Sequence, residues 1–186
     1  LVHALSGSVL ANAPQQSPMK RYYQHLHRLS SAFAVVTDVS MLIMQSGLKR
    51  REMISARLGD LLSNLYLVSM VLKQYEDQGN PEADRPLVEW ACQYLFNQYQ
   101  QAMHEVLLNF PNRLAALKMR LLVFPLGQQF NKPSDELERQ IADLIIHDTP
   151  TRQRLIAGVF DGESDYHPIH NLNEAMIMAD EVLPLE

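Results

Sequence analysis

Apolar residues recur every three or four positions through the first half of the chain, the spacing of one face of an α-helix. One such stripe runs between Pro18 and Ser46 and stops at Gly47, and a second ends where Gly79-Asn80-Pro81 breaks the pattern. The two stripes are Leu26, Leu29, Phe33, Val36, Ser40 and Ile43, then Ile54, Leu58, Leu61, Leu65, Val68 and Leu72. They predict two long helices joined at Gly47 as an antiparallel hairpin.

Two further helices follow from the same spacing. One begins near Asp84, a residue type that caps helix N-termini, with Pro86 in its first turn, and it ends before Pro111. Its apolar stripe is Val88, Cys92, Leu95, Tyr99, Ala102 and Val106. The next helix should span about 112–124, up to the break at Pro125-Leu126-Gly127.

Three shorter helices are expected near the end of the chain. Ser134 caps the first, and Thr149-Pro150 opens the second. Asn171, followed three residues later by Glu174, has the spacing of a capping box and predicts the start of the third. The last two helices would be separated by a loop over 161–170.

These elements predict an all-α fold: a four-helix-bundle-like body, made of the long hairpin and two further helices, with a short helical acidic C-terminal extension. The chain has 7 glycines and no useful run of alternating apolar and polar residues, which disfavours a β fold. We divide it into an N-terminal segment carried over from a preceding domain (1–17), the bundle body (18–132) and the acidic extension packed on the bundle (133–186).

Charge differs sharply between the body and the extension. Residues 1–132 hold 13 basic and 9 acidic side chains, whereas 133–186 hold 3 and 12. The net charges of +4 and −9 that follow argue against a nucleic-acid binder and for an acidic segment attached to a mildly basic body. The single cysteine, Cys92, cannot form an internal disulfide and is expected to pack in a helix.

Membrane insertion is not expected from the hydropathy pattern. The longest apolar run, 32–44, contains Thr37, Asp38 and Ser40 and is shorter than the roughly 20 residues that cross a bilayer. Residues 1–14 lack the basic start of a signal peptide. We therefore predict no transmembrane helix and no secretory leader.

Asp38 lies among apolar neighbours, where an unpaired buried carboxylate would cost several kcal/mol. Folding the hairpin at Gly47 brings position 38 level with Arg57. We therefore predict a structural ion pair between Asp38 and Arg57.

Two groups of basic residues are candidate contact surfaces. Lys49, Arg50 and Arg51 lie at the start of the second helix and oppose its dipole. Cross-hairpin pairing of Lys20 and Arg21 with the acidic end of that helix is one explanation for such placement; the other is a basic patch that meets an acidic partner or an anionic lipid.

The second group, Arg113, Lys118 and Arg120, lies in a broadly apolar helix within a stretch, 111–132, that has no acidic residue. That composition suits a helix at a membrane surface or one docked on another domain, although ordinary bundle core explains it too.

Catalytic and cofactor motifs are absent from the sequence. No two glycines have the spacing of a dinucleotide-binding fingerprint or a P-loop. His25 and His27 fall on different helix faces, and the acidic loop 161–170 lacks the turn glycine and distal glutamate of a calcium loop. We predict no catalytic residue, no cofactor-binding residue and no metal site in this chain.

Several blocks of sequence, in order, resemble the C-terminal region of the long bacterial fatty acyl-CoA dehydrogenases. They are YYQHLHRLSSAFA at 22–34, LKRREMISARLGDLLSNLYL at 48–67, YEDQG at 75–79, EADRPL at 82–87, NFPNR at 109–113, FPLG at 124–127 and KPSD at 132–135. The similarity covers about 20–160. Residues 57–67 are also similar to the very-long-chain mitochondrial relatives, where an added helical domain contributes to membrane association.

The resemblance implies a parent enzyme that uses FAD to oxidise a fatty acyl-CoA to the trans-2-enoyl thioester, with its catalytic glutamate and flavin site in upstream domains. This chain alone would then hold no cofactor and be inactive. Its expected partners are the upstream catalytic domains, a second copy in a homodimer, or a membrane surface. The enzyme would be cytoplasmic, or peripheral to the inner membrane. An unrelated helical partner-binding domain is the remaining alternative.

Overall fold

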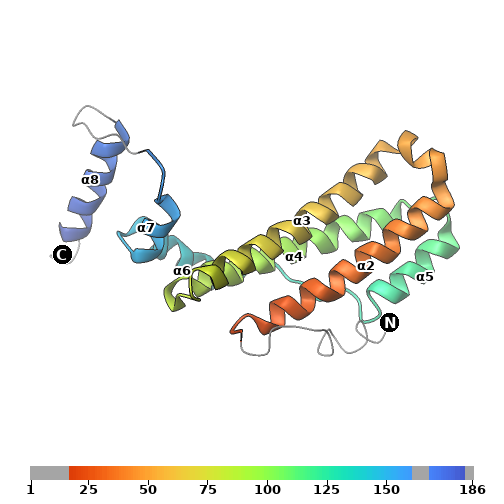
Figure 1. The fold of residues 1–186 in the computed structure, drawn as a ribbon, viewed down its shortest axis with the longest axis horizontal. Helices are drawn as coiled ribbons and strands as arrows, with labels where there is room; N and C mark the ends of the chain where they lie inside the picture. Colours follow the sequence, from red (N-terminus) through yellow and green to blue (C-terminus); the bar gives the residue numbers. More distant parts are fainter. Residues whose placement is uncertain (1–16, 161–167, 183–186) are drawn as a thin grey trace. The chain divides into compact units, whose positions relative to one another are not determined.

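The computed structural model describes residues 17–160 and 168–182, which are helical and contain no strand, so the predicted all-α class is confirmed. Figure 1 shows the helices. They are α2 (Lys20–Met44), α3 (Glu52–Asp77), α4 (Arg85–Leu108), α5 (Arg113–Val123), α6 (Asp135–Ile146), α7 (Pro150–Ile156) and α8 (Pro168–Val182), with 3-10 helices at Gln45–Arg50 and Glu82–Asp84.

The chain forms two compact units. The first contains Leu1–Asn80 and Val88–Pro133, and the second contains Pro81–Leu87 and Ser134–Glu186. The short connection between α3 and α4 therefore belongs with the C-terminal helices and not with the helices that flank it in sequence. The prediction that 133–186 packs on the bundle remains a prediction.

In the first unit, α2 and α3 form the predicted hairpin, which is visible in Figure 1 as the red-to-orange and orange-to-yellow pair. All six residues of the α3 stripe are buried, as the spacing predicted. The α2 stripe is buried at Leu29, Val36 and Ser40, and the hydroxyl of Ser40 donates to the carbonyl of Val36 at 2.6 Å. Ile43, the last residue of that stripe, is instead 40% exposed.

Helices α4 and α5 complete the same hydrophobic core, which fits the predicted four-helix-bundle-like body. The side chain of Asn112 caps α5 by accepting hydrogen bonds from the backbone N–H groups of Leu114 (3.1 Å) and Ala115 (3.0 Å). Tyr99 of α4 is fully buried, and its hydroxyl donates to the carbonyl of Leu29 on α2 at 2.8 Å. This bond joins two helices that are 70 residues apart in sequence.

The segment after α5 is held on α4 by one glutamine. Oε1 of Gln100 accepts from the backbone N–H groups of Gln129 (2.8 Å) and Phe130 (3.0 Å), while its Nε2 donates to the carbonyl of Phe130 at 3.0 Å. Asn97 donates to the same carbonyl at 2.8 Å. These bonds satisfy backbone groups that would otherwise be paired within a helix or sheet. They also fix the Phe130 ring against Phe96 and His25.

The second unit is organised around a buried carboxylate. Asp84 accepts hydrogen bonds from the hydroxyl of Thr151 (2.5 Å) and from Nε of Arg154 (2.7 Å), with a further contact to Nη2 of Arg154. Ser134 and Thr149 cap α6 and α7, as predicted. The carboxylate of Asp84 therefore ties α7 to the connection that precedes α4.

The start of the last helix was predicted wrongly. Helix α8 begins at Pro168, so Asn171 and Glu174 lie inside it and form no capping box. Proline is a favoured residue at the first helical position because its missing N–H would have no partner there. The rest of the predicted loop, 161–167, lies outside the described residues.

Replacing Gln100 should destabilise the first unit. In Gln100→Leu, the backbone N–H groups of Gln129 and Phe130 lose their acceptor, and unmet buried groups cost about 1 to 3 kcal/mol each. We expect a loss of roughly 2 to 3 kcal/mol in urea unfolding followed by circular dichroism. Gln74→Leu, at an exposed position of α3 in the same unit, is the control and should change stability by less than about 0.5 kcal/mol. Equal effects of the two substitutions would contradict this role of Gln100.

The second unit should lose stability in acid. The hydrogen bond from Arg154, with the one from Thr151, lowers the pKa of Asp84 against the opposing effect of burial. A lowered folded-state pKa means that the stabilisation is complete above the ordinary carboxyl pKa of about 4 and is lost as the pH falls through the lowered value.

Amide hydrogen exchange in α7 between pH 7 and pH 2 measures this loss. Asp84→Asn should weaken the protection of the α7 amides from exchange at neutral pH. It should also remove most of the further loss of protection that the wild type shows as the pH falls. Asp143→Asn, which changes an exposed acid in the same unit, should show the same dependence of protection on pH as the wild type. A wild-type profile in Asp84→Asn would show that the ion pair does not stabilise this unit.

Candidate functional site

The predicted basic surface before α3 is exposed. Lys49 and Arg50 lie in the 3-10 helix Gln45–Arg50, and Arg51 follows it. Arg50, Arg51 and Arg57 line one open cavity of about 550 Å³. Among the described residues, Lys49, Arg50 and Arg51 form no ion pair, so their charge faces solvent.

The other predicted basic residues, Arg113, Lys118 and Arg120, are exposed on α5. Between them, Leu114, Leu117 and Leu121 are also exposed, by 73%, 55% and 58%, whereas the inner face of the helix buries Ala116, Met119 and Val123. Bundle core therefore accounts for one side of α5 only. Its outer side combines leucines with cations, the composition of a helix that docks on an apolar or anionic surface.

The predicted ion pair between Asp38 and Arg57 does not form. Asp38 is exposed, and Nε of Arg57 donates to Oε2 of Glu105 on α4 at 2.7 Å. Placing the two residues level along the hairpin ignored rotation about each helix axis: Arg57 faces α4, whereas Asp38 faces solvent and needs no cation.

The acidic end of α3 finds partners other than Lys20 and Arg21. Asp77 pairs with Lys73 of the same helix at 2.5 Å. Burial, together with a hydrogen bond to Glu76, raises the pKa of the Tyr23 hydroxyl. The cross-hairpin contact thus joins a carboxylate to a phenol and not to a lysine or arginine.

A buried arginine on α2 was not predicted from the sequence. Arg28 is only 4% exposed, and its guanidinium lies 5.5 Å from the centre of the Phe130 ring. Its Nε and Nη2 atoms are buried without a hydrogen-bond partner in the described part of the chain. Burial, and the nearby charge of Arg21, lower the pKa of Arg28.

Neighbouring side chains on the same face of α2 extend this cluster. Burial, Arg21 and Arg28 lower the pKa of His25 to about 4, and the imidazole packs edge-on against Phe96 and Phe130. Arg21, His25 and Phe130 line a cavity of about 270 Å³. One feature of the sequence could have indicated this unpaired arginine, because residues 1–37 contain no acidic side chain that could neutralise Arg28.

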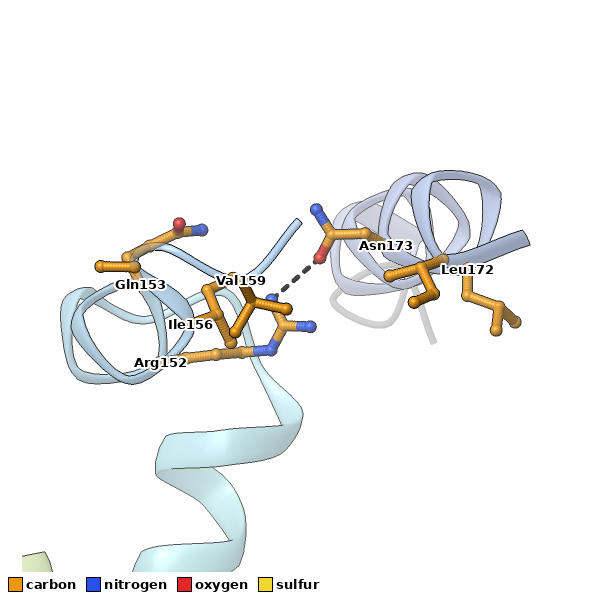
Figure 2. A pocket seen from close by; sticks show the side chains of 8 residues that line it. Arg152, Gln153, Ile156, Val159, Leu172 and Asn173 are labelled. Atoms are coloured by element: carbon orange, nitrogen blue, oxygen red, sulfur yellow. Dashed lines mark hydrogen bonds between the residues drawn. The ribbon is translucent and has the colours of Figure 1, made fainter. Parts of the chain in front are cut away.

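The second unit contains a separate cavity of about 330 Å³ between α7 and α8. Figure 2 shows Ile156, Val159 and Leu172 around it, and a hydrogen bond of 3.0 Å from Nη1 of Arg152 to Oδ1 of Asn173 across one side. The described residues of its lining are mainly apolar and include neither a carboxylate nor a histidine. Nothing in this cavity suggests bond-making chemistry.

Metal and nucleophile chemistry find no support in the described residues. Within 17–160 and 168–182, no three His, Cys, Asp or Glu side chains come together as a metal site. The acidic loop lies largely in the undescribed segment 161–167. Burial raises the pKa of Cys92 to about 12, so this thiol is protonated at neutral pH, which fits the expected packing role.

The described residues do not fit a flavin. A dinucleotide needs backbone that can approach its diphosphate closely, usually at glycines. An added Cβ would meet no atom within 4 Å at any of the described glycines, which are Gly47, Gly59, Gly79, Gly127 and Gly158. None of them therefore lies where a side chain would block the close approach of a diphosphate. We derive no flavin chemistry from this chain.

One stretch, Lys20–Arg50, is long and apolar enough to cross a membrane by length and composition alone. Only 17% of its most apolar window is buried, although α2 also supplies Leu29 and Val36 to the core. The expectation of no transmembrane helix therefore remains a prediction.

The comparison with known families agrees with the ordered blocks of sequence. The profile described as "Acyl-CoA dehydrogenase, C-terminal, bacterial type" matches residues 1–186. No solved structure matched the chain. The match includes the blocks at 22–34 and 48–67, whose residues build the α2–α3 hairpin. The chain thus belongs to the bacterial-type C-terminal family of acyl-CoA dehydrogenases.

Proposed function

We propose that this chain is an accessory domain of an FAD-dependent enzyme that oxidises fatty acyl-CoA to trans-2-enoyl-CoA, and that it acts by packing against the upstream catalytic domains. Family membership supports the parent activity. The chain would hold no cofactor and be inactive alone, because its described cavities do not pair a general base with a flavin-sized slot. Its contribution would be a contact surface.

The outer face of α3 carries this proposal. Leu62, Tyr66, Leu67 and Met70 are 46–62% exposed at the middle of the helix. They lie on the side away from the stripe of six buried residues, so α3 is apolar on two faces. A helix that only completed a solvated bundle would be polar on its outer face.

The composition of this α3 patch (Leu62, Tyr66, Leu67 and Met70) suits a protein contact. Tyrosine and methionine are enriched in interface cores, and clustered exposed apolar side chains mark contact sites. Asp60 and Lys73 flank the patch and are exposed, as expected for a polar rim. The upstream domains of the same polypeptide are the partner present at the highest effective concentration. Pairing with a second copy is the alternative for the same patch.

Membrane docking is the second candidate function, and the outer face of α5 favours it. Three exposed leucines alternate there with Arg113, Lys118 and Arg120, and an anionic bilayer would receive both the apolar and the cationic side chains. An unrelated partner-binding domain, the third alternative, is excluded by the family match.

Charges placed in the α3 patch should disrupt assembly. The double variant Leu62→Glu, Tyr66→Glu of the full-length enzyme would have to bury two carboxylates at the contact, at several kcal/mol each. We expect at least about a tenfold loss of palmitoyl-CoA dehydrogenation, with release of flavin measured by its fluorescence.

Met53→Glu is the matched control, because Met53 is 68% exposed on the same helix but outside the patch. Light scattering separates the two partners: loss of dimers with retained flavin would indicate a contact between copies. Unchanged flavin content, activity and dimer mass in the double variant would refute packing through α3.

Docking on membranes predicts salt-sensitive binding to anionic vesicles. Replacing Arg113, Lys118 and Arg120 together by glutamine should weaken co-sedimentation by up to about 100-fold, since each basic residue near such a surface contributes about 1 kcal/mol. The matching triple substitution at Lys49, Arg50 and Arg51 tests the other basic surface with the same change of charge. If the wild-type protein shows no binding that weakens between 50 mM and 500 mM salt, this candidate is eliminated.

A further inference from the structure

Arg28 carries a positive charge that the described structure leaves without a hydrogen-bonded counter-ion. Its Nε and Nη2 atoms form one edge of the guanidinium, the edge that binds two oxygens of a carboxylate or phosphate side by side. Both atoms are buried and have no partner among the described residues. The Phe130 ring compensates in part through a cation–π contact. The face of the Phe130 ring, however, does not accept hydrogen bonds from the Nε and Nη2 groups of Arg28.

The surrounding segments cannot supply the missing anion. Arg28 lies on α2, Tyr99 on α4, and Phe130 after α5. The stretches of sequence that contain these residues, 1–37, 90–104 and 106–134, have no aspartate or glutamate at all. These three stretches therefore hold no carboxylate that could pair with Arg28, and Glu76 of α3 is hydrogen-bonded to Tyr23 instead.

Beside the guanidinium is a space for a ligand. The cavity of about 270 Å³ is lined by His25 and Arg21, which lie one and two helical turns before Arg28, and by Phe130, which Arg28 also contacts. The amides of Gln93, Gln129 and Asn131 add neutral donors to its wall. Arg28 does not line the cavity itself; it adjoins the cavity through the Phe130 ring, which it contacts and which forms part of the wall.

We propose that Arg28, with Arg21 and the cavity beside them, forms a binding site for a phosphate monoester, an activity beyond the accessory packing role. Two permanent positive charges favour a dianion over the single charge of a carboxylate. A phosphate also has three oxygens, enough for the edge of Arg28, the guanidinium of Arg21 and a wall amide at once. His25 adds a further donor when it is protonated.

Calorimetric titration of the full-length protein with inorganic phosphate tests the site directly. Coenzyme A and dephospho-coenzyme A form a matched pair that differs by one phosphate monoester, a choice that rests on the family of the protein. Vesicles containing phosphatidic acid, compared with phosphatidylserine vesicles of equal charge, present the same group as a lipid headgroup. We expect phosphate to bind and coenzyme A, or phosphatidic acid, to bind at least about tenfold more tightly than its matched partner.

Variants assign the binding to Arg28. Arg28→Gln should weaken phosphate binding by tenfold or more, and Arg28→Lys should restore part of it, because lysine keeps the charge but lacks the two-pronged edge. Arg21→Gln changes an exposed residue and so tests the site even if Arg28→Gln does not fold. Lys20→Gln, the exposed neighbour with the same loss of charge, is the control and should bind as the wild type does.

Tighter binding of coenzyme A than of dephospho-coenzyme A, with the difference lost in Arg28→Gln, would identify a soluble phosphate monoester as the ligand. Preference for phosphatidic acid alone would identify a lipid headgroup. Both outcomes support the site. Failure of the wild type to bind any of these probes, or equal binding by the wild type, Arg28→Gln and Arg21→Gln, would overturn it. Flavin retention and assembly through α3 are separate readouts, so either proposal can fail without the other.

Discussion

Burial of one face of α3 is the constraint from which the first unit is built. Its six stripe residues, from Ile54 to Leu72, are removed from water, and each such side chain contributes about 1.5 to 3 kcal/mol when fully buried. Helices α2 and α4 supply the opposing surfaces, with Leu29, Val36 and Phe96 among the residues in the same core. Because α3 is long, neighbours must cover the stripe along its whole length, which accounts for two further helices of similar length.

Polar contacts then determine which arrangement of those helices is adopted. The amide of Gln100 supplies the donors and acceptor that an irregular segment needs, and Tyr99 fixes α4 against the backbone of α2. Apolar packing tolerates small rotations and shifts, whereas these bonds have narrow geometric limits. Arg28 is the exception within this core, since its buried guanidinium adds a cost that a bound anion would offset.

Periodicity and capping chemistry predicted the helices because both are local properties of the sequence. The buried face of α3 and the caps at Ser134 and Thr149 all depend on residues within a few positions of one another. The helix boundary at Pro168 was missed because a capping-box spacing occurs by chance inside helices, where both side chains face solvent.

Long-range polar contacts were not predictable in the same way. The pairing of Arg57 with Glu105 depends on how α3 and α4 are rotated about their axes, which spacing along either helix does not determine. The cavity beside Arg28 depends equally on the path of the segment after α5. The basic residues of α5 were identified from the sequence because all three lie within one short helix, although the sequence analysis did not state which leucines would face outward.

The discontinuity of the second unit affects the order in which the protein can fold during synthesis. Asp84 leaves the ribosome long before its partners, since Thr151 and Arg154 lie 67 and 70 residues further along the chain. The helices of the first unit are complete by then, so the bundle can form while the segment around Asp84 still waits for α7. A nascent chain halted at the end of the bundle would therefore present the Asp84 carboxylate without the hydroxyl and guanidinium partners that α7 supplies.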